Sequence, residues 1–105
     1  MQWVEVHRQK RFAPEKFQKV NLFDSPRMFC DLYCFEPGQE QKLHLHAHSD
    51  KIYYVLEGEG LFRIGEEEKV LSAGMATMAP PGVEHGVRNT GRERLTLLVF
   101  MAPKP

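Results

Sequence analysis

Hydrophobic residues in this chain fall in short runs, many of them alternating with polar residues, and no stretch keeps a helical period over a dozen residues. A period of two is typical of strands that bury one face. The pattern predicts strands over 3–6, 17–20, 27–35, 42–48, 52–56, 61–64, 69–72, 76–79, 85–88 and 95–101. Glycine or proline separates many of them, and strands at this spacing favour an all-β barrel or sandwich.

Length and charge narrow the class of protein. A chain of 105 residues supports one core, so we expect a single domain over 1–105. Its 14 basic and 14 acidic residues cancel, which leaves no net field to attract nucleic acid or an anionic membrane. No apolar run reaches the roughly 18 residues of a membrane span, and the N-terminus lacks a signal-peptide pattern. We therefore expect a cytoplasmic protein with neither of those partners.

Four of the five histidines fall in two places along the chain. The first contains His44, His46 and His48, and the second contains His85. Alternate residues of an extended strand share a face and lie roughly 6.5–7 Å apart. Two such imidazoles can converge on one ion at about 2.0–2.1 Å, with a third from a distant strand. The rigid turn predicted at 80–82 would fix where His85 projects. The pattern therefore indicates a metal site inside a β-shell.

The spacing around these histidines resembles the two motifs of the cupin superfamily, the small double-stranded β-helix barrels. The first motif spans 38–58 and the second spans 74–89. The matching positions are Gly38, His44, His46 and Gly58, then Gly74, Pro80, Gly82, His85 and Asn89. The resemblance implies a jelly-roll barrel of two antiparallel sheets. It also implies a metal held by two histidines and a glutamate of the first motif and the histidine of the second.

The chain departs from this pattern at one position, where Lys51 stands in place of the glutamate. An ammonium group has no lone pair to offer a cation. At about 5 Å from a dication and an effective dielectric near 20, the repulsion is roughly 6–7 kcal/mol. We expect the Lys51 amine to be deprotonated, to be turned out of the barrel, or to be separated from the metal by an anion.

Three arrangements of the site stay open. His44, His46 and His85 can form a three-histidine centre with open positions for water or substrate. His48 can replace the missing carboxylate if the chain bends after His46. The barrel can also hold no metal. Imidazole ligands suit Fe, Ni, Cu and Zn better than Mg or Ca, so the predicted cofactor is a divalent transition metal.

The leading functional hypothesis is a metal-dependent enzyme that acts on a small organic molecule. Its reaction would be an oxygenation (a dioxygenase, hence an oxidoreductase), or a lyase or isomerase step. Lys51 and Tyr53, which share a strand face by parity, would orient or deprotonate the substrate. One alternative is a metal-independent cupin similar to sugar epimerases. The other is a non-catalytic module that binds or senses a small molecule.

Two further expectations concern the thiols and the assembly. Cys30 and Cys34 lie in one predicted strand about 13 Å apart, too far for a disulfide, so we expect free, buried thiols. The alternative is a thiol that faces the metal cavity. We also expect a homodimer in which the N-terminal strand, with Trp3 and Val4, adds to the sheet edge of a neighbour.

Overall fold

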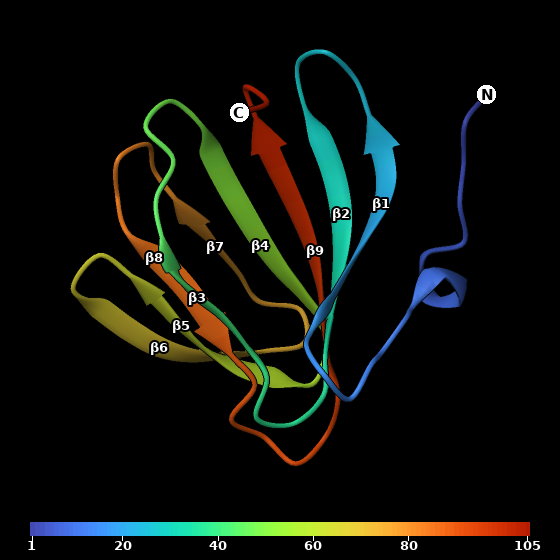
Figure 1. Cartoon of the computed structure of the whole chain (residues 1–105), viewed down its shortest axis with the longest axis vertical. Helices are drawn as coiled ribbons and strands as arrows, with labels where there is room; N and C mark the ends of the chain where they lie inside the picture. The colour runs from blue at the N-terminus through green and yellow to red at the C-terminus, as the bar shows by residue number, and fades with distance from the viewer.

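The computed structural model describes all 105 residues, and the alternation in the sequence becomes nine β-strands after one short 3-10 helix, Val6–Gln9. The strands are β1 (Gln18–Asp24), β2 (Phe29–Phe35), β3 (Glu40–His44), β4 (Asp50–Glu57), β5 (Glu59–Ile64), β6 (Glu67–Ser72), β7 (Ala76–Ala79), β8 (His85–Arg88) and β9 (Leu95–Ala102). They form a five-stranded sheet in the order β1-β2-β9-β4-β7 and a four-stranded sheet in the order β3-β8-β5-β6 (Figure 1). Every pairing is antiparallel, which confirms the predicted all-β architecture.

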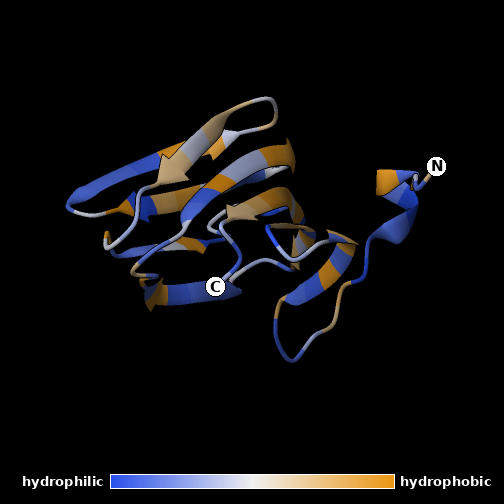
Figure 2. Ribbon diagram, turned by 90° about the horizontal axis from the view of Figure 1, so that it is seen from above, coloured by the Kyte–Doolittle hydropathy of each residue, from blue (hydrophilic) through white to orange (hydrophobic).

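The hydrophobic core lies between the two sheets and is built from alternate strand positions. In β4, Tyr53 and Val55 are fully buried, whereas Ile52 and Tyr54 are exposed. Figure 2 shows residues of opposite hydropathy alternating along the strands. The core cluster consists of Tyr33, Phe35, Tyr53, Val55, Phe62, Leu71, Val87, Leu95, Leu97 and Val99. Each large apolar side chain buried in this way contributes about 1.5–3 kcal/mol, so the cluster is a main source of stability.

The predicted strand at 3–6 is wrong. Its backbone groups make no sheet hydrogen bonds, and the segment runs outside both sheets (Figure 1). A short alternating segment becomes a strand only where a sheet edge supplies partners. The N-terminal segment instead contacts the barrel through Lys10 and Arg11. Lys10 forms an ion pair with Glu57, and the Arg11 N–H donates a hydrogen bond to Cys34 Sγ at 3.5 Å.

Two predicted strands are shorter than expected. The strand predicted over 27–35 begins at Phe29, because Ser25 Oγ accepts hydrogen bonds from the N–H groups of Arg27 and Met28, each at 3.2 Å, and closes a turn there. The strand predicted over 42–48 ends at His44, and the chain bends at 47–48. His46 and His48 therefore lie on the loop between β3 and β4.

The two thiols are free and buried, as predicted. Cys30 lies in an apolar groove with Met28 and Phe100, on the face of β2 opposite Tyr33. Cys34 has the same parity on that strand. The alternative of a thiol facing the metal cavity is therefore wrong. The structure contains no helix with the length and apolar character needed to cross a membrane.

Candidate metal centre

Three histidines from separate parts of the chain meet at the inner face of the four-stranded sheet. His44 ends β3 and pairs directly with His85, the first residue of β8, while His46 follows on the next loop. One ligand atom from each residue lies within 4.8 Å of the others. The centroid of the His44 ring is 4.3 Å from that of His85 and 5.2 Å from that of His46. Nitrogens that share one tetrahedral ion lie about 3.3 Å apart, so small side-chain rotations suffice to complete the set.

The turn at 80–82 joins the two parts of the cluster. The Gly82 N–H donates a hydrogen bond of 2.8 Å to the carbonyl oxygen of His46. Gly82 has a φ of 75°, a left-handed conformation that favours glycine. This bond ties the loop that carries His46 to the chain that leads into His85. The turn therefore positions both imidazoles, as its sequence indicated for one of them.

The backbone fixes the tautomer of two imidazoles. Nδ1 of His44 lies 2.7 Å from the carbonyl oxygen of Lys42, and Nδ1 of His85 lies 2.9 Å from that of Val83. A carbonyl oxygen only accepts, so each Nδ1 carries the hydrogen and donates it, and each Nε2 keeps its lone pair. Backbone carbonyls orient metal-binding histidines in the same way.

The imidazoles are kept in the neutral form that binds metal. Burial, as the main cause, lowers the pKa of His85 to about 4. It is also the main cause of the lowered pKa values of His44 and His46. The charge of Lys51 adds to the effect on all three. Nε2 of His85 is buried and has no hydrogen-bond partner. An unpaired buried acceptor costs about 1–3 kcal/mol, and a bound cation would remove that cost.

Lys51 is 2% exposed and points into the site, so of the three alternatives the one in which it turns out of the barrel is wrong. Its Nζ lies 3.2 Å from Nε2 of His44 and 3.3 Å from Oε1 of Gln41. Burial, with a smaller contribution from Lys19, lowers the pKa of Lys51 to about 7. Both charge states of the amine are therefore populated near neutral pH. The amine occupies the lone pair that His44 would give to a metal, so metal binding requires it to move aside.

Gln41 links Lys51 to Tyr53, and sequence reasoning missed it. Tyr53 is fully buried on the same face as Lys51, as parity predicted, and its hydroxyl donates to Oε1 of Gln41 at 2.8 Å. Strand parity places Gln41 and His44 on opposite faces. A bulge between them shifts the register of β3 against β8, so both reach the interior. No signal in the sequence reveals that bulge.

His48 does not join the cluster. It is exposed on the loop after β3, and the three-residue group of His44, His46 and His85 does not include it. The chain does bend after His46, which was the condition for His48 to take part, but the bend leaves its side chain in solvent. The four-histidine arrangement gains no support from this geometry.

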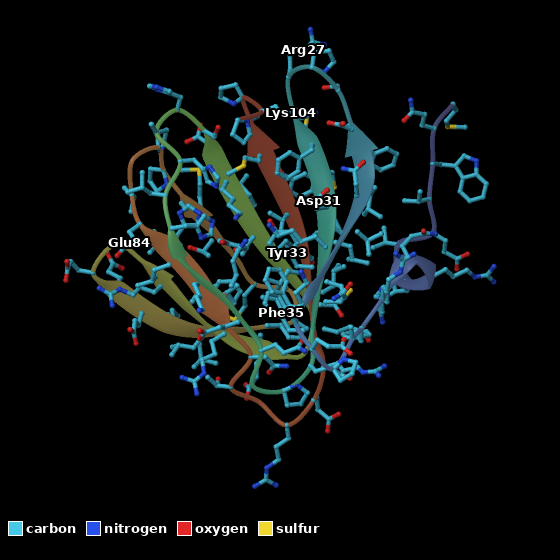
Figure 3. The ribbon with its side chains drawn as sticks, in the orientation of Figure 1. Arg27, Asp31, Tyr33, Phe35, Glu84 and Lys104 are labelled. Atoms are coloured by element: carbon cyan, nitrogen blue, oxygen red, sulfur yellow. The ribbon has the colours of Figure 1, made fainter.

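An open cavity of about 660 Å³ lies beside the histidines. His44, His46 and Lys51 line one side of it. Its other side comes from β1 and β2, with Lys19 and Tyr33 among the lining residues. In Figure 3, Tyr33 lies in the middle of the molecule. The sequence did not single out this second wall, because it comes from strands that carry no motif residue.

Comparison with known proteins identifies relatives for most of the chain. A family model described as "Cupin domain" matches residues 31–101. An oxalate-binding protein from Thermotoga maritima is 36% identical over 83 residues, which cover 79% of this chain and 68% of that protein. An uncharacterized protein from Methanocaldococcus jannaschii is 35% identical over 66 residues, or 63% of this chain, and the match spans about half of its length, 53%.

Solved structures agree with the fold. A protein from Thermus thermophilus has a TM-score of 0.97 at 50% identity, with 100% of both chains covered. A Klebsiella pneumoniae protein described as having a double-stranded beta-helix domain has a TM-score of 0.90 at 25% identity, with 98% of this chain and 90% of that chain covered. These likenesses confirm the predicted double-stranded β-helix.

Replacing Lys51 with methionine tests the cost of burying its amine. The pKa of Lys51 is about 7 in the folded protein against an ordinary value of 10.5, so the unfolded chain binds the proton more tightly. Below pH 7 both states are protonated and the folded state bears the full cost, which disappears as pH rises from 7 to 10.5. We expect Lys51→Met to raise the free energy of unfolding of metal-free protein by about 2–4 kcal/mol at pH 6.

Urea denaturation from pH 6 to pH 10.5 measures this effect, and the difference between Lys51→Met and the wild type should approach zero at the upper end. Lys69→Met is the matched control, because Lys69 is exposed on β6. A difference for Lys51→Met that stays constant with pH would contradict the explanation.

Proposed function

Because the chain belongs to the cupin domain family, we propose that it is a metal-dependent enzyme with a small carboxylic acid as substrate. His44, His46 and His85 would hold a divalent transition metal. The observation that carries the proposal is the state of the imidazole nitrogens. Nδ1 of His44 and of His85 faces a backbone carbonyl oxygen, and Nε2 of His85 is buried with no partner. Nitrogen donors of this kind suit Fe, Ni, Cu and Zn.

Lys51 supports a carboxylate as the second component. A protonated amine beside a dication is strongly repelled unless an anion lies between them. A carboxylate bound to the metal would meet that need, because it can accept a hydrogen bond from Lys51 at the same time. The oxalate-binding relative from Thermotoga maritima, 36% identical, is consistent with this class of ligand. When bound, the metal would supply Lewis-acid polarisation of the substrate.

The proposed roles of Lys51 and Tyr53 follow from their contacts. Lys51, with a pKa lowered to about 7 by burial, can give or take a proton near neutral pH. Tyr53 stays protonated, because burial raises its pKa well above the ordinary value. Its hydroxyl binds Gln41, which also binds Lys51. We therefore propose Lys51 as the proton carrier, with Tyr53 and Gln41 holding it in position.

A second candidate function is metal-independent acid–base chemistry, as in the epimerase-like alternative. The hydrogen bond of 3.2 Å between Lys51 Nζ and His44 Nε2 favours it, because the amine donates to the nitrogen that a metal would otherwise take. Measuring the metal content of the protein separates the two candidates. The first requires stoichiometric metal, whereas the second requires none.

Metal analysis of protein made without a polyhistidine tag tests the first candidate. We expect about one equivalent per chain after incubation with Zn²⁺ or Ni²⁺, and at least 100-fold weaker binding for His44→Ala or His85→Ala, because each removes one of three ligands. His48→Ala is the matched control and should change the affinity less than threefold. Less than a tenth of an equivalent after metal loading would overturn the proposal in favour of the second candidate.

Restoring the glutamate of the cupin motif gives a second test. In Lys51→Glu a carboxylate replaces the repelled amine, so we expect Zn²⁺ to bind at least 100-fold more tightly than in the wild type. Lys51→Gln removes only the positive charge and should fall between the two. Calorimetric titration measures all three affinities, and circular dichroism checks the fold. Equal affinities for Lys51→Glu and Lys51→Gln would mean that position 51 lies outside the metal's reach.

We also propose a homodimer, but through a surface other than the N-terminal strand expected from the sequence, because residues 3–6 form no strand. Cys30, Phe100, Ile52 and Met78 form one cross-strand row on the outer face of the five-stranded sheet. Ile52 and Met78 are 40% and 49% exposed, and an apolar patch of this kind marks an interaction surface. Light scattering should give about twice the chain mass of 12.2 kDa, and Ile52→Lys should reduce it to the single-chain value. A wild-type mass of one chain would contradict the proposal.

A further inference from the structure

Four lysines line the cavity beside the histidines: Lys16, Lys19, Lys42 and Lys51. They are four of the seven lysines in the chain, and none of them forms an ion pair with a carboxylate. Glu40 is the only acidic residue of the lining. Because the chain carries no net charge overall, this is a local concentration of positive charge. It favours an anionic ligand.

Two of these lysines flank the same aromatic ring. The Nζ atoms of Lys19 and Lys51 each lie 5.4 Å from the ring centroid of Tyr33. Lys51 is buried beside the histidines, whereas Lys19 is exposed on β1.

The nearby carboxylate of Asp31 does not pair with either amine. Asp31 lies two residues before Tyr33 on β2 (Figure 3), and its Oδ1 accepts a hydrogen bond of 2.8 Å from Asn21. Burial raises the pKa of Asp31, while the charges of Lys19 and Lys51 act on it in the opposite direction. The two lysines thus keep their capacity to bind an anionic ligand directly.

The cavity has room for a ligand larger than a two-carbon acid. Its volume of about 660 Å³ falls in the range of roughly 300–1,000 Å³ that holds drug-sized ligands. The wall between the two amines is aromatic. The ring of Phe17 lies 5.5 Å from that of Tyr33 and is stacked on that of Phe35 at 4.6 Å. A flat, apolar part of a ligand packs well against such a wall.

We propose that the cavity binds a dianion longer than oxalate, a dicarboxylate with a planar apolar middle, with one carboxylate at Lys51 and the other at Lys19. The middle of the ligand lies along Tyr33. Lys19 is then the residue that selects for a second acidic group. This inference rests on the proposed function, since it requires a carboxylate bound at Lys51 beside the histidines.

Calorimetric titration with terephthalate, benzoate and oxalate tests the proposal on the full chain, both loaded with Zn²⁺ and treated with chelator. Terephthalate has two carboxylates on opposite ends of one ring, whereas benzoate has only one. We expect Lys19→Gln to weaken terephthalate binding about fivefold, because it removes the exposed ion pair between the Lys19 amine and the second carboxylate of terephthalate. Its effect on benzoate and oxalate should stay below twofold. Lys69→Gln makes the same change at an exposed position of β6, and it should alter none of the three affinities.

The outcomes separate this inference from the proposed function. A chain that binds no Zn²⁺ overturns the proposed function, whatever the anions do. A chain that binds Zn²⁺ but loses terephthalate and benzoate equally in Lys19→Gln overturns the second subsite alone. Failure of the wild type to bind terephthalate more tightly than benzoate also overturns it. A fivefold loss confined to terephthalate supports it.

Discussion

The antiparallel pairing of β3 with β8 is the constraint on which the candidate site depends. It places His44 opposite His85, and its bulge brings Gln41 to the same interior. A slip of one residue would send His44 to the outer face. The register of the sheet and the geometry of the site are therefore one requirement. The bond from Gly82 to the carbonyl oxygen of His46 then adds the third imidazole, since it holds the loop after β3 against the turn before β8.

A buried amine at position 51 changes what this scaffold can do. Lys51 is inside the barrel with contacts to His44 and Gln41, and Tyr33 and Tyr53 present their rings to it. Cation–π contacts favour the charged amine, whereas burial favours the neutral one. Burial is the main cause that lowers the pKa of the amine to about 7. A motif glutamate would lend a bound metal a negative charge, whereas Lys51 has none to give, so in the proposed function that charge would come from a ligand.

Much of the fold could be predicted from the sequence, because alternation and turn residues are local signals. Nine of the ten predicted strands exist, and the motif histidines meet as their spacing indicated. The strand at 3–6 was wrong because an alternating pattern cannot reveal whether a partner edge is present. Gln41 was missed because a bulge reverses parity, and Lys19 and Tyr33 because β1 and β2 carry no motif. These features depend on long-range packing.

In the proposed function, the charge of the site would link the binding of a metal to the binding of an anion. Three neutral imidazoles would leave a bound divalent ion with its full charge, and Lys51 and Lys19 would add to the positive field around it. Each anionic group that entered would lower the free-energy cost of binding the metal, and the metal would attract the anion in return. By thermodynamic linkage the two effects on affinity are equal. In the proposed function the lysines would weaken a bare metal site and at the same time make it selective for acidic ligands, so Lys51 and Lys19 would belong to the recognition chemistry as much as the histidines.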